Sequence, residues 1–210
     1  MNTVFYFLSP TELDEELYNR IFSFMPYERR QKYAKGIKSY RYEGVACYGL
    51  LMYAASTKGI NYKNMTFSYE ENGKPFTKEL FFNFSHCDEC VICAVSDGNI
   101  GADVQKKSNA SQAVIEKYCT DAEQAALKDG MPFKRLWSQK EAVVKCTGEG
   151  IAALTKLCDL SGSKQDGVSY KTPYGYLYTS FIGECAVSVC SEEKETRFIE
   201  VTTDMLNGLT

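Results

Sequence analysis

Residues 91–104 read VICAVSDGNIGADV and contain the pattern that decides the fold class. The apolar, β-rich run Val91–Ser96 predicts a strand, and residues 97–99 (Asp-Gly-Asn) predict the turn that ends it. Ile100–Val104 predicts a second short strand directly after the turn. Helical patterns lie on both sides of this stretch, so the order of elements predicts an α/β (α+β) fold.

Outward from this stretch, predicted helices and strands alternate. Apolar residues at three- and four-residue steps, such as Leu13, Leu17 and Ile21, predict a first helix with Thr11 as its N-cap. The turn-rich residues 70–75 separate two further strand patterns. The predicted helices cover residues 11–35, 39–57, 108–128 and 132–147. The other predicted strands cover residues 1–8, 65–69 and 81–84, and short strands and turns lead from the last helix to a polar tail.

A short repeated sequence, referred to below as the Cys-Ala-Val-Ser echo, bears on the domain organisation. Cys93–Ser96 and Cys185–Ser188 both read Cys-Ala-Val-Ser, each within a β-rich apolar segment. Such a match also arises by chance; a true repeat would favour two similar α/β halves that face each other. Because no linker or low-complexity stretch separates the halves, we expect residues 1–103 and 104–210 to form two tightly packed subdomains.

Composition limits the class of protein. The 210 residues carry a net charge of −3 with a pI of about 5.4, and 44% of them are hydrophobic. These values are typical of a globular protein and argue against non-specific nucleic-acid binding, which needs a basic face. No stretch approaches the roughly 18 apolar residues of a membrane span, and residues 1–8 lack the charge and length of a signal peptide. We expect a soluble, cytoplasmic protein without membrane or nucleic-acid partners.

The nine cysteines lie mostly in apolar runs, which predicts reduced thiols rather than a disulfide framework. His86, Cys87, Cys90 and Cys93 have the close spacing of a metal cluster. A ferredoxin-like run would continue with Cys-Pro, but positions 97–98 hold Asp-Gly. A structural zinc site would usually draw a second Cys/His pair, and the chain has no other CxxC. A redox or metal protein built on this cluster is therefore the weaker hypothesis.

Asp103 and Gln105 are the first candidates for a functional site. Residues two apart in a strand point to the same face, so these side chains could aim two oxygens at one cation. Mg²⁺ favours carboxylate and carbonyl oxygens and keeps several waters beside substrate phosphates. Polar pairs at strand ends are more often simply solvated, so this pattern alone is weak.

The segment 133–145 provides a second candidate. On a helix, Trp137, Glu141 and Lys145 lie on one face at four-residue steps. The simplest interpretation is a buried tryptophan with a surface Glu–Lys pair worth about 0.2–0.5 kcal/mol. The functional interpretation is a carboxylate with lysines around a phosphate and a metal, the set that phosphoryl transfer needs.

Four motifs in order make the pattern specific. They are Gly73-Lys74-Pro75, Asn83-Phe84-Ser85-His86, Gly101-Ala102-Asp103 and Trp137-x-x-Lys140-Glu141-Ala142-x-x-Lys145. This arrangement resembles the 4′-phosphopantetheinyl transferases of the Sfp type, whose motifs read GKP, N-x-SH, G-(I/V)-D-(I/V)-E and W-x-x-KE-(S/A)-x-x-K. The resemblance runs from about residue 20 to about residue 190.

The resemblance implies a fold and a reaction. Members of the family fold as two similar α/β subdomains, with coenzyme A and Mg²⁺ held in the cleft between them. A serine of an apo acyl or peptidyl carrier protein attacks the β-phosphate of coenzyme A, and 3′,5′-ADP leaves. The Sfp-like length and two-half organisation further imply a monomer.

The resemblance also implies roles for individual residues. Asp103 and Glu141, with Gln105, would ligate Mg²⁺. Residues implied to contact coenzyme A are Lys140 and Lys145 at the phosphates, Ser85 and His86 at the nucleotide phosphates, and Lys74 and Pro75 at the adenine. The 3′-phosphate would be bound by basic residues on or after the first helix, for which Arg29, Arg30, Lys32 and Arg41 are available. Without a fixed register, a solvated basic face remains an equal alternative for each of these four.

Gln105 departs from the family pattern, since many relatives have glutamate there. An amide oxygen can ligate Mg²⁺, but it cannot accept a proton at neutral pH. We therefore expect Glu141 to be the general base for the incoming serine, with Asp103 and Lys145 completing the catalytic group. The alternative is a weakly active or inactive relative that binds coenzyme A or a carrier protein without transfer.

Overall fold

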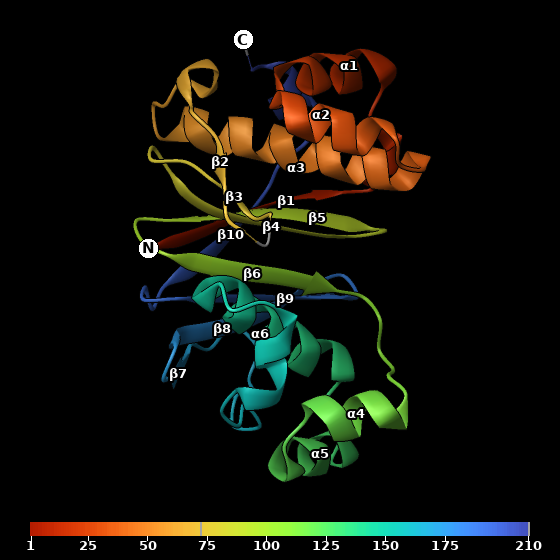
Figure 1. Ribbon diagram of the computed structural model, residues 1–210, viewed down its shortest axis with the longest axis vertical. Helices are drawn as coiled ribbons and strands as arrows, with labels where there is room; N and C mark the ends of the chain where they lie inside the picture. The colour runs from red at the N-terminus through yellow and green to blue at the C-terminus, as the bar shows by residue number, and fades with distance from the viewer. Residues whose placement is uncertain (72, 210) are drawn as a thin grey trace. The chain divides into compact units, whose positions relative to one another are not determined.

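The computed structural model describes residues 1–71 and 73–209, and its chain divides into two units (Figure 1). The N-terminal unit comprises Thr3–Asp97 and Arg197–Thr210, and the C-terminal unit comprises Met1–Asn2 and Gly98–Thr196. The expected boundary after residue 103 falls inside strand β6 (Ile100–Gln105). The division lies instead in the predicted turn after Ser96, because β6 pairs with strands that follow it in sequence.

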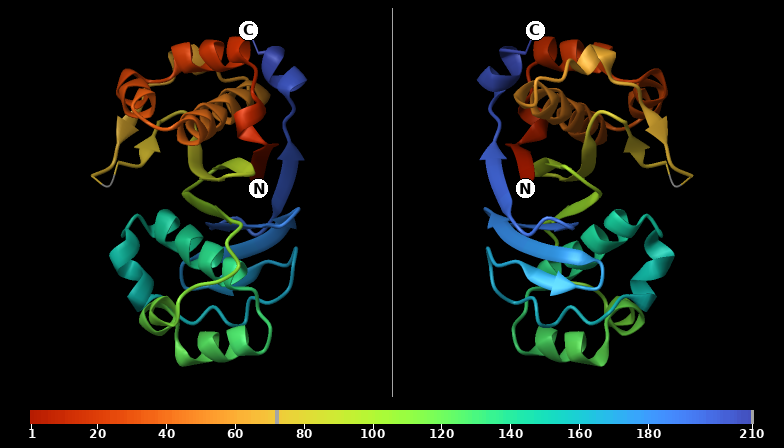
Figure 2. Two further views of the ribbon diagram at one scale, coloured as in Figure 1. Left: turned by 90° about the vertical axis from the view of Figure 1, so that its right-hand side faces the viewer. Right: turned by 90° about the vertical axis from the view of Figure 1, so that its left-hand side faces the viewer.

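The N-terminal unit contains a four-stranded sheet in the order β10-β1-β5-β4. Its central strand β5 is buried along its whole length, and the long helix α3 packs against it (Figures 1 and 2). The sequence predicted α3 within one residue at its start. The bounds are β1 Asn2–Leu8, α3 Lys38–Thr57, β4 Phe81–Cys87, β5 Cys90–Ser96 and β10 Thr196–Glu200.

The single helix predicted over 11–35 is wrong, because this segment forms three pieces. They are the 3₁₀ turn η1 (Pro10–Glu12), α1 (Glu15–Phe24) and α2 (Tyr27–Ala34). Asp14, not Thr11, caps α1, since its side chain accepts the Leu17 amide at 2.7 Å. Met25 is extended because it precedes Pro26, whose ring disfavours a helical conformation at the residue before it.

Smaller elements complete the N-terminal unit. The 3₁₀ turn η2 (Tyr62–Asn64) precedes an antiparallel pair, β2 (Ser68–Tyr69) and β3 (Pro75–Phe76). The expected turn over residues 70–75 includes position 72, which lies outside the described residues. The polar tail is more ordered than predicted, because it forms β10 and then α7 (Thr203–Asn207), whose Leu206 is buried.

The C-terminal unit contains a second four-stranded sheet, in the order β6-β9-β8-β7. Helix α6 packs against β6 and β9. The helix predicted over 108–128 breaks in two at Thr120, which forms a capping box with Glu123. The remaining bounds are α4 Gln112–Tyr118, α5 Asp121–Lys128, α6 Phe133–Thr147, η3 Ile151–Lys156, β7 Tyr170–Thr172, β8 Gly175–Ile182 and β9 Cys185–Ser191.

Gly101 fixes how closely α6 lies on β6. A Cβ added at this position would collide with the backbone of Ala142 and Cys146. Because only glycine lacks that atom, helix and strand approach directly here. The approach brings the middle of β6 under the last two turns of α6, where the sequence placed its candidate residues.

The two units follow the same chain path, with a strand, a long helix and then a two-stranded hairpin whose second strand pairs with the first strand. The Cys-Ala-Val-Ser echo does not mark equivalent positions. The hairpins pair Cys87 with Cys90 and Ile182 with Cys185, so the structural counterpart of Cys185 is Cys90 rather than Cys93. An offset of three residues puts the echoed side chains on opposite faces.

Two global properties follow from the described residues. All nine cysteines are free thiols. In the described part of the chain, no helix combines the length and apolar character needed to cross a membrane.

Candidate functional site

Asp103 is the centre of a charged group in the C-terminal unit. It lies in β6 with 3% of its surface exposed, and two neighbours bond its carboxylate. The Lys145 Nζ donates to Oδ1 at 2.6 Å, and the Gln105 Nε2 donates to Oδ2 at 3.0 Å. The predicted pair Asp103 and Gln105 therefore shares one face, and the lysine predicted from the next motif joins it.

Glu141 adds a second carboxylate from α6, one turn before Lys145. Burial raises the pKa of Glu141, the negative charge of Asp103 raises it further, and Lys145 partly offsets both. The two carboxylates thus act on each other, and the group concentrates negative charge where water is partly excluded.

A pocket of about 420 Å³ opens beside these carboxylates. Gln105 and Glu141 provide polar groups, and aromatic and aliphatic side chains provide much of the wall. Within the wall, Trp137 stacks on Phe133 and meets the Tyr118 ring edge-on. The lining residues are Gln105, Lys107, Asn109, Ala110, Ser111, Val114, Tyr118, Phe133, Trp137, Glu141 and Ile151.

The donor set fits a hard divalent cation. Asp103, Glu141 and Gln105 supply carboxylate and amide oxygens, and Mg²⁺ is usually held by one or two carboxylates together with water and substrate phosphates. Over residues 1–71 and 73–209, no group of three or more His, Cys, Asp and Glu side chains could hold a metal.

Lys140 of α6 forms a buried ion pair. Its side chain is 1% exposed, and its Nζ pairs with Glu123 Oε2 at 2.9 Å. Glu123 also accepts the amides of Thr120 and Leu160, so the pair ties α6 to the start of α5 and to the segment after η3. Lys140 is not among the residues that line the Glu141 pocket, and its contact with phosphates stays a prediction.

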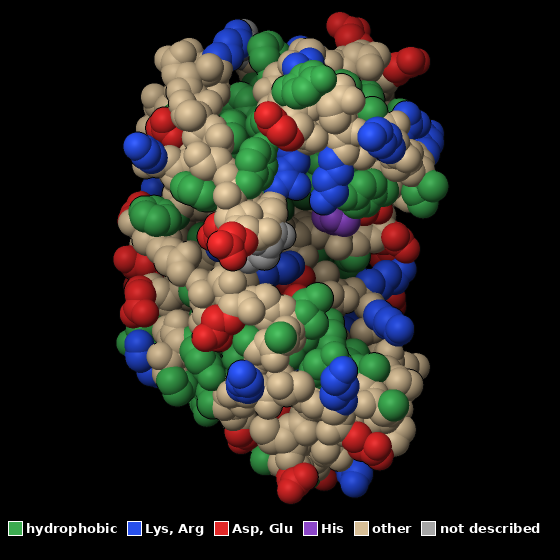
Figure 3. Space-filling model, viewed as in Figure 1, with side chains coloured by type: hydrophobic (Ala, Val, Ile, Leu, Met, Phe, Trp, Pro, Cys, Tyr) green, Lys and Arg blue, Asp and Glu red, His purple; other side chains and the backbone are tan. Residues whose placement is uncertain are grey.

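The second group of candidate residues lies in the N-terminal unit around His86 on β4. The His86 Nδ1 lies 2.6 Å from the Glu43 Oε2 of α3, and the Tyr40 ring lies edge-on to the imidazole. Ser85, its neighbour in β4, is buried. The imidazole itself is partly exposed and reaches the molecular surface (Figure 3).

The basic residues of this unit differ in what they contact. The Arg29 guanidinium lies over the Tyr69 ring at 4.6 Å and donates to the Gly73 carbonyl, which ties α2 to the turn before Lys74. Lys32 is exposed. The Nε atoms of Arg30 and Arg41 are buried and meet no acceptor among the described residues.

Comparison with known proteins identifies the segment that carries the first group. Residues 99–192 match the model of the 4′-phosphopantetheinyl transferase superfamily, and this stretch contains Asp103, Glu141 and Lys145. The sequence resemblance to its Sfp type is thereby confirmed.

Curated relatives extend the superfamily match. The chain is 28% identical over 155 residues to the 4′-phosphopantetheinyl transferase gsp of Aneurinibacillus migulanus, covering 68% of this chain and 64% of that one. It is 32% identical over 102 residues to the 4′-phosphopantetheinyl transferase Sfp of Bacillus subtilis (strain 168), covering 44% and 46%. The match to HetI of Nostoc sp. is 30% over 115 residues, covering 47% and 48%. The matched stretches thus span less than two thirds of each of these relatives.

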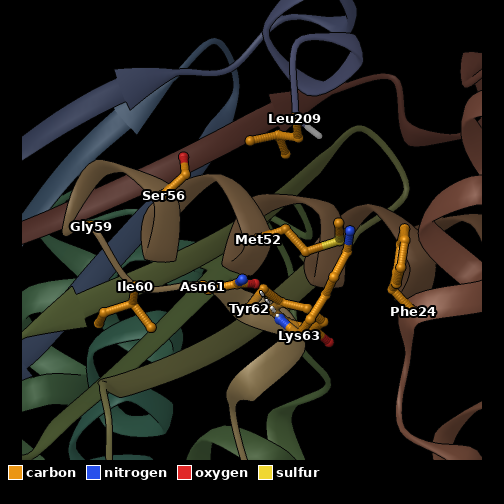
Figure 4. Close-up of a pocket in the computed structure, with 9 residues that line it drawn as sticks. All are labelled: Phe24, Met52, Ser56, Gly59, Ile60, Asn61, Tyr62, Lys63 and Leu209. Atoms are coloured by element: carbon orange, nitrogen blue, oxygen red, sulfur yellow. Dashed lines mark hydrogen bonds between the residues drawn. The ribbon is translucent and has the colours of Figure 1, made fainter.

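A further pocket lies in the N-terminal unit, with a volume of about 280 Å³ (Figure 4). Met52, Tyr62 and Lys63 are among its lining residues, and Lys63 Nζ lies over the Phe24 ring at 5.1 Å. None of the residues that the sequence motifs single out lines it.

Sequence reasoning missed Glu43 and Glu123, the two buried carboxylates that pair with motif residues. A signal existed for Glu43, because it is the only acidic residue in α3 and lies where the helix becomes buried. Glu123 could have been found from Thr120, since Thr-x-x-Glu before a helical pattern is the signature of a capping box.

Proposed function

We propose that the protein transfers the 4′-phosphopantetheine group from coenzyme A to a serine of an apo acyl or peptidyl carrier protein, releasing 3′,5′-ADP. The observation that carries this proposal is the group of Asp103, Glu141 and Lys145 within the segment that matches the superfamily. The names of the matched relatives support it, since each is called a 4′-phosphopantetheinyl transferase.

Asp103 and Glu141, with the Gln105 amide, would hold Mg²⁺. When bound, this ion would offset the negative charge that develops on the pyrophosphate during transfer. The carboxylates themselves arrange the site: Asp103 anchors Lys145, and the ammonium supplies a positive charge for the substrate phosphates.

Glu141 is our candidate for the group that accepts the serine proton. Its position supports this role, because Glu141 lies in the pocket wall whereas Asp103 is buried in β6 and does not line the pocket. The hydrophobic side chains around the pocket limit the access of water to the transferring group. Gln105 has no basic oxygen at neutral pH, so it would serve as a ligand only.

The N-terminal unit would bind the nucleotide portion of coenzyme A. Ser85 and His86 would contact its phosphates, and Lys74 and Pro75 its adenine. Among the basic residues, Arg30 and Arg41 are the candidates for the 3′-phosphate, because the buried Nε of each meets no acceptor among the described residues. Arg29 already contacts Tyr69 and Gly73, and we give it the supporting role of holding the turn before Lys74.

We propose a monomeric enzyme of the cytoplasm. The free state of the cysteines is consistent with a reducing compartment. Carrier proteins are usually acidic near the modified serine, so a chain with net charge −3 would recognise one through a local patch.

Mass spectrometry of a purified carrier protein tests the proposal. After incubation with this protein, coenzyme A and Mg²⁺, the apo carrier should gain the mass of one phosphopantetheine group. The gain should disappear with EDTA and with Glu141→Ala. Coenzyme A binding without transfer to any of several carriers would favour the non-catalytic alternative, and the absence of coenzyme A binding would contradict the proposed function.

A further inference from the structure

Glu43, a residue without an assigned role so far, forms a close pair with His86. Glu43 is 6% exposed, in a helix whose neighbouring residues 44–51 are all buried. Burying a carboxylate is unfavourable unless hydrogen bonds compensate for the lost water. Its side chain meets His86 at 2.6 Å, so the energetic cost of burial is offset at the imidazole.

The geometry limits how the imidazole can be protonated. An ionised carboxylate only accepts hydrogen bonds, so the Nδ1 that faces Glu43 must carry a proton. The Tyr40 ring, one turn earlier on α3, contacts the same imidazole with a centroid separation of 6.1 Å. Two side chains of one helix therefore fix the orientation of the ring, and Nε2 is the ring nitrogen that Glu43 leaves for a ligand.

We propose that Glu43 is a positioning residue that holds His86 with Nδ1 protonated and Nε2 directed at a phosphate group of the nucleotide. This inference rests on the proposed function, which supplies the phosphate ligand. A phosphate oxygen is an acceptor, so Nε2 must donate to it, and His86 then carries both protons. The second proton comes from solvent, and the Glu43 carboxylate stabilises the resulting imidazolium between two negative groups.

The described neighbours of the imidazole come from α3 and β5, and a basic side chain adjoins it at the surface (Figure 3). On α3, Glu43 and Tyr40 contact the imidazole, and the basic residue Arg41 lies between them in the sequence of the helix. On β5, the residue paired with His86 is the apolar Val91. Among these contacts, Glu43 is the negatively charged group that can balance a positive charge on the imidazole.

Nitrogen-15 NMR of the imidazole tests the positioning directly, because His86 is the only histidine in the chain. In the free protein at neutral pH, we expect the Nδ1–H form, whereas an unconstrained imidazole in water favours Nε2–H. Glu43→Leu should return His86 to the solution preference. Glu43→Gln keeps an acceptor oxygen and should retain Nδ1–H. A wild-type spectrum showing Nε2–H would overturn the proposal, whatever the enzymatic activity.

Calorimetry with 3′,5′-ADP measures the consequence for binding. In two buffers of different ionisation enthalpy, binding to the wild type should take up a proton, and Glu43→Leu should bind about tenfold more weakly with less uptake. Glu43→Gln, which preserves shape, should show a smaller loss of affinity and also less uptake. Glu200→Gln is the matched control, since it removes the same charge in the same unit from a carboxylate that contacts Tyr6.

The outcomes separate the inference from the proposed function. If Glu43→Gln binds 3′,5′-ADP with wild-type affinity and proton uptake, the positioning role is wrong although the protein binds nucleotide. If the wild type binds neither 3′,5′-ADP nor coenzyme A, the proposed function fails. The Nδ1–H measurement on the free protein then still decides whether Glu43 orients His86. Should Glu43→Leu not fold, the wild type and Glu43→Gln are sufficient for the decision.

Discussion

The two sheets follow the same path but fill the space under their long helices differently. Asp103 pairs with the fourth residue of β9, and Phe5 pairs with the fourth residue of β5, so the two occupy equivalent positions. Gln105 and Phe7 are equivalent by the same register. Both positions under α3 contribute to an apolar core, whereas their counterparts under α6 form a charged group.

The contrast continues through the sheet of the C-terminal unit. Ser188, the partner of Asp103, lies within 2.7 Å of Ser138 on α6 and 3.0 Å of Thr179 on β8, all of them buried. Its counterpart under α3 is Cys93, part of the hydrophobic cluster. Buried polar groups contribute less to stability than apolar ones and must be fully bonded. The same chain path thus holds an apolar cluster under the long helix of one unit and a charged group under that of the other.

The largest expected effect is a loss of activity when the charged group of the C-terminal unit is disrupted. Glu141→Ala should lower kcat/KM for carrier modification by about 10²–10⁴-fold, the usual contribution of a positioned acid or base. Gln105→Ala is the companion variant and should lose much less, because we assign it no proton transfer. Equal losses in the two variants would show that our division of roles is wrong.

A substitution in the apolar core of the N-terminal unit should instead lower the stability of the fold. Phe5→Ala removes a fully buried ring that meets Tyr53 edge-on, and should lower the free energy of unfolding by about 3–5 kcal/mol. Denaturant unfolding measures this loss. The transfer rate per folded molecule should stay near that of the wild type at low temperature. A variant of wild-type stability would contradict the core position that we give to Phe5.

Lys140→Met tests whether this lysine stabilises the fold or contacts the substrate phosphates. Removing one partner of a buried ion pair should cost about 3–5 kcal/mol, because Glu123 would be left uncompensated. Unfolding measurements and the KM for coenzyme A should be made on the same sample. Unchanged stability with a raised KM would instead support the contact between Lys140 and phosphates that the motif implies.

The smallest expected effect is a dependence of stability on pH that arises from Glu141. Burial and the charge of Asp103 raise the pKa of Glu141 above its ordinary value of 4.5. Its favourable contribution to folding is therefore present below that value and is lost as pH rises through the folded-state pKa. At pH 7 in EDTA, Glu141→Gln should raise the melting temperature, by roughly 2–4 °C for each kcal/mol of relieved strain.

The comparison for this prediction is the same pair of proteins at pH 4, where both should melt at similar temperatures. A variant that is less stable than the wild type at pH 7 would mean that the ionised carboxylate is well accommodated in the fold.

The sequence predicted those parts of the site that depend on local spacing. Asp103 and Gln105 are two apart on a strand and Glu141 and Lys145 four apart on a helix, so geometry follows from the periods of the two structures. Glu43 and Glu123 could not be assigned this way, because their partners His86 and Lys140 come from elements distant in sequence. The 3′-phosphate ligand could not be fixed for a similar reason, since the exposure of Arg30 and Arg41 depends on packing.

The elements were predicted well where one periodic pattern fills the whole helix or strand, as in α3 and α6. Errors arose where periodicity continues across a break, at Pro26 and at Thr120. In both cases a local signal, a proline or a capping residue, overrides the hydrophobic pattern. The C-terminal helix α7 was missed because one buried residue, Leu206, anchors a short polar segment.

Gly101 has a consequence for engineering. A single added methyl group there would push apart the two elements that carry Asp103 and Glu141, so this position leaves no room for variation. The pocket wall, in contrast, includes Val114 and Ile151 from outside those two elements. A mutant library intended to change the shape of the pocket should therefore randomise the wall and keep position 101 constant, so that the substitutions do not alter the spacing of the carboxylates.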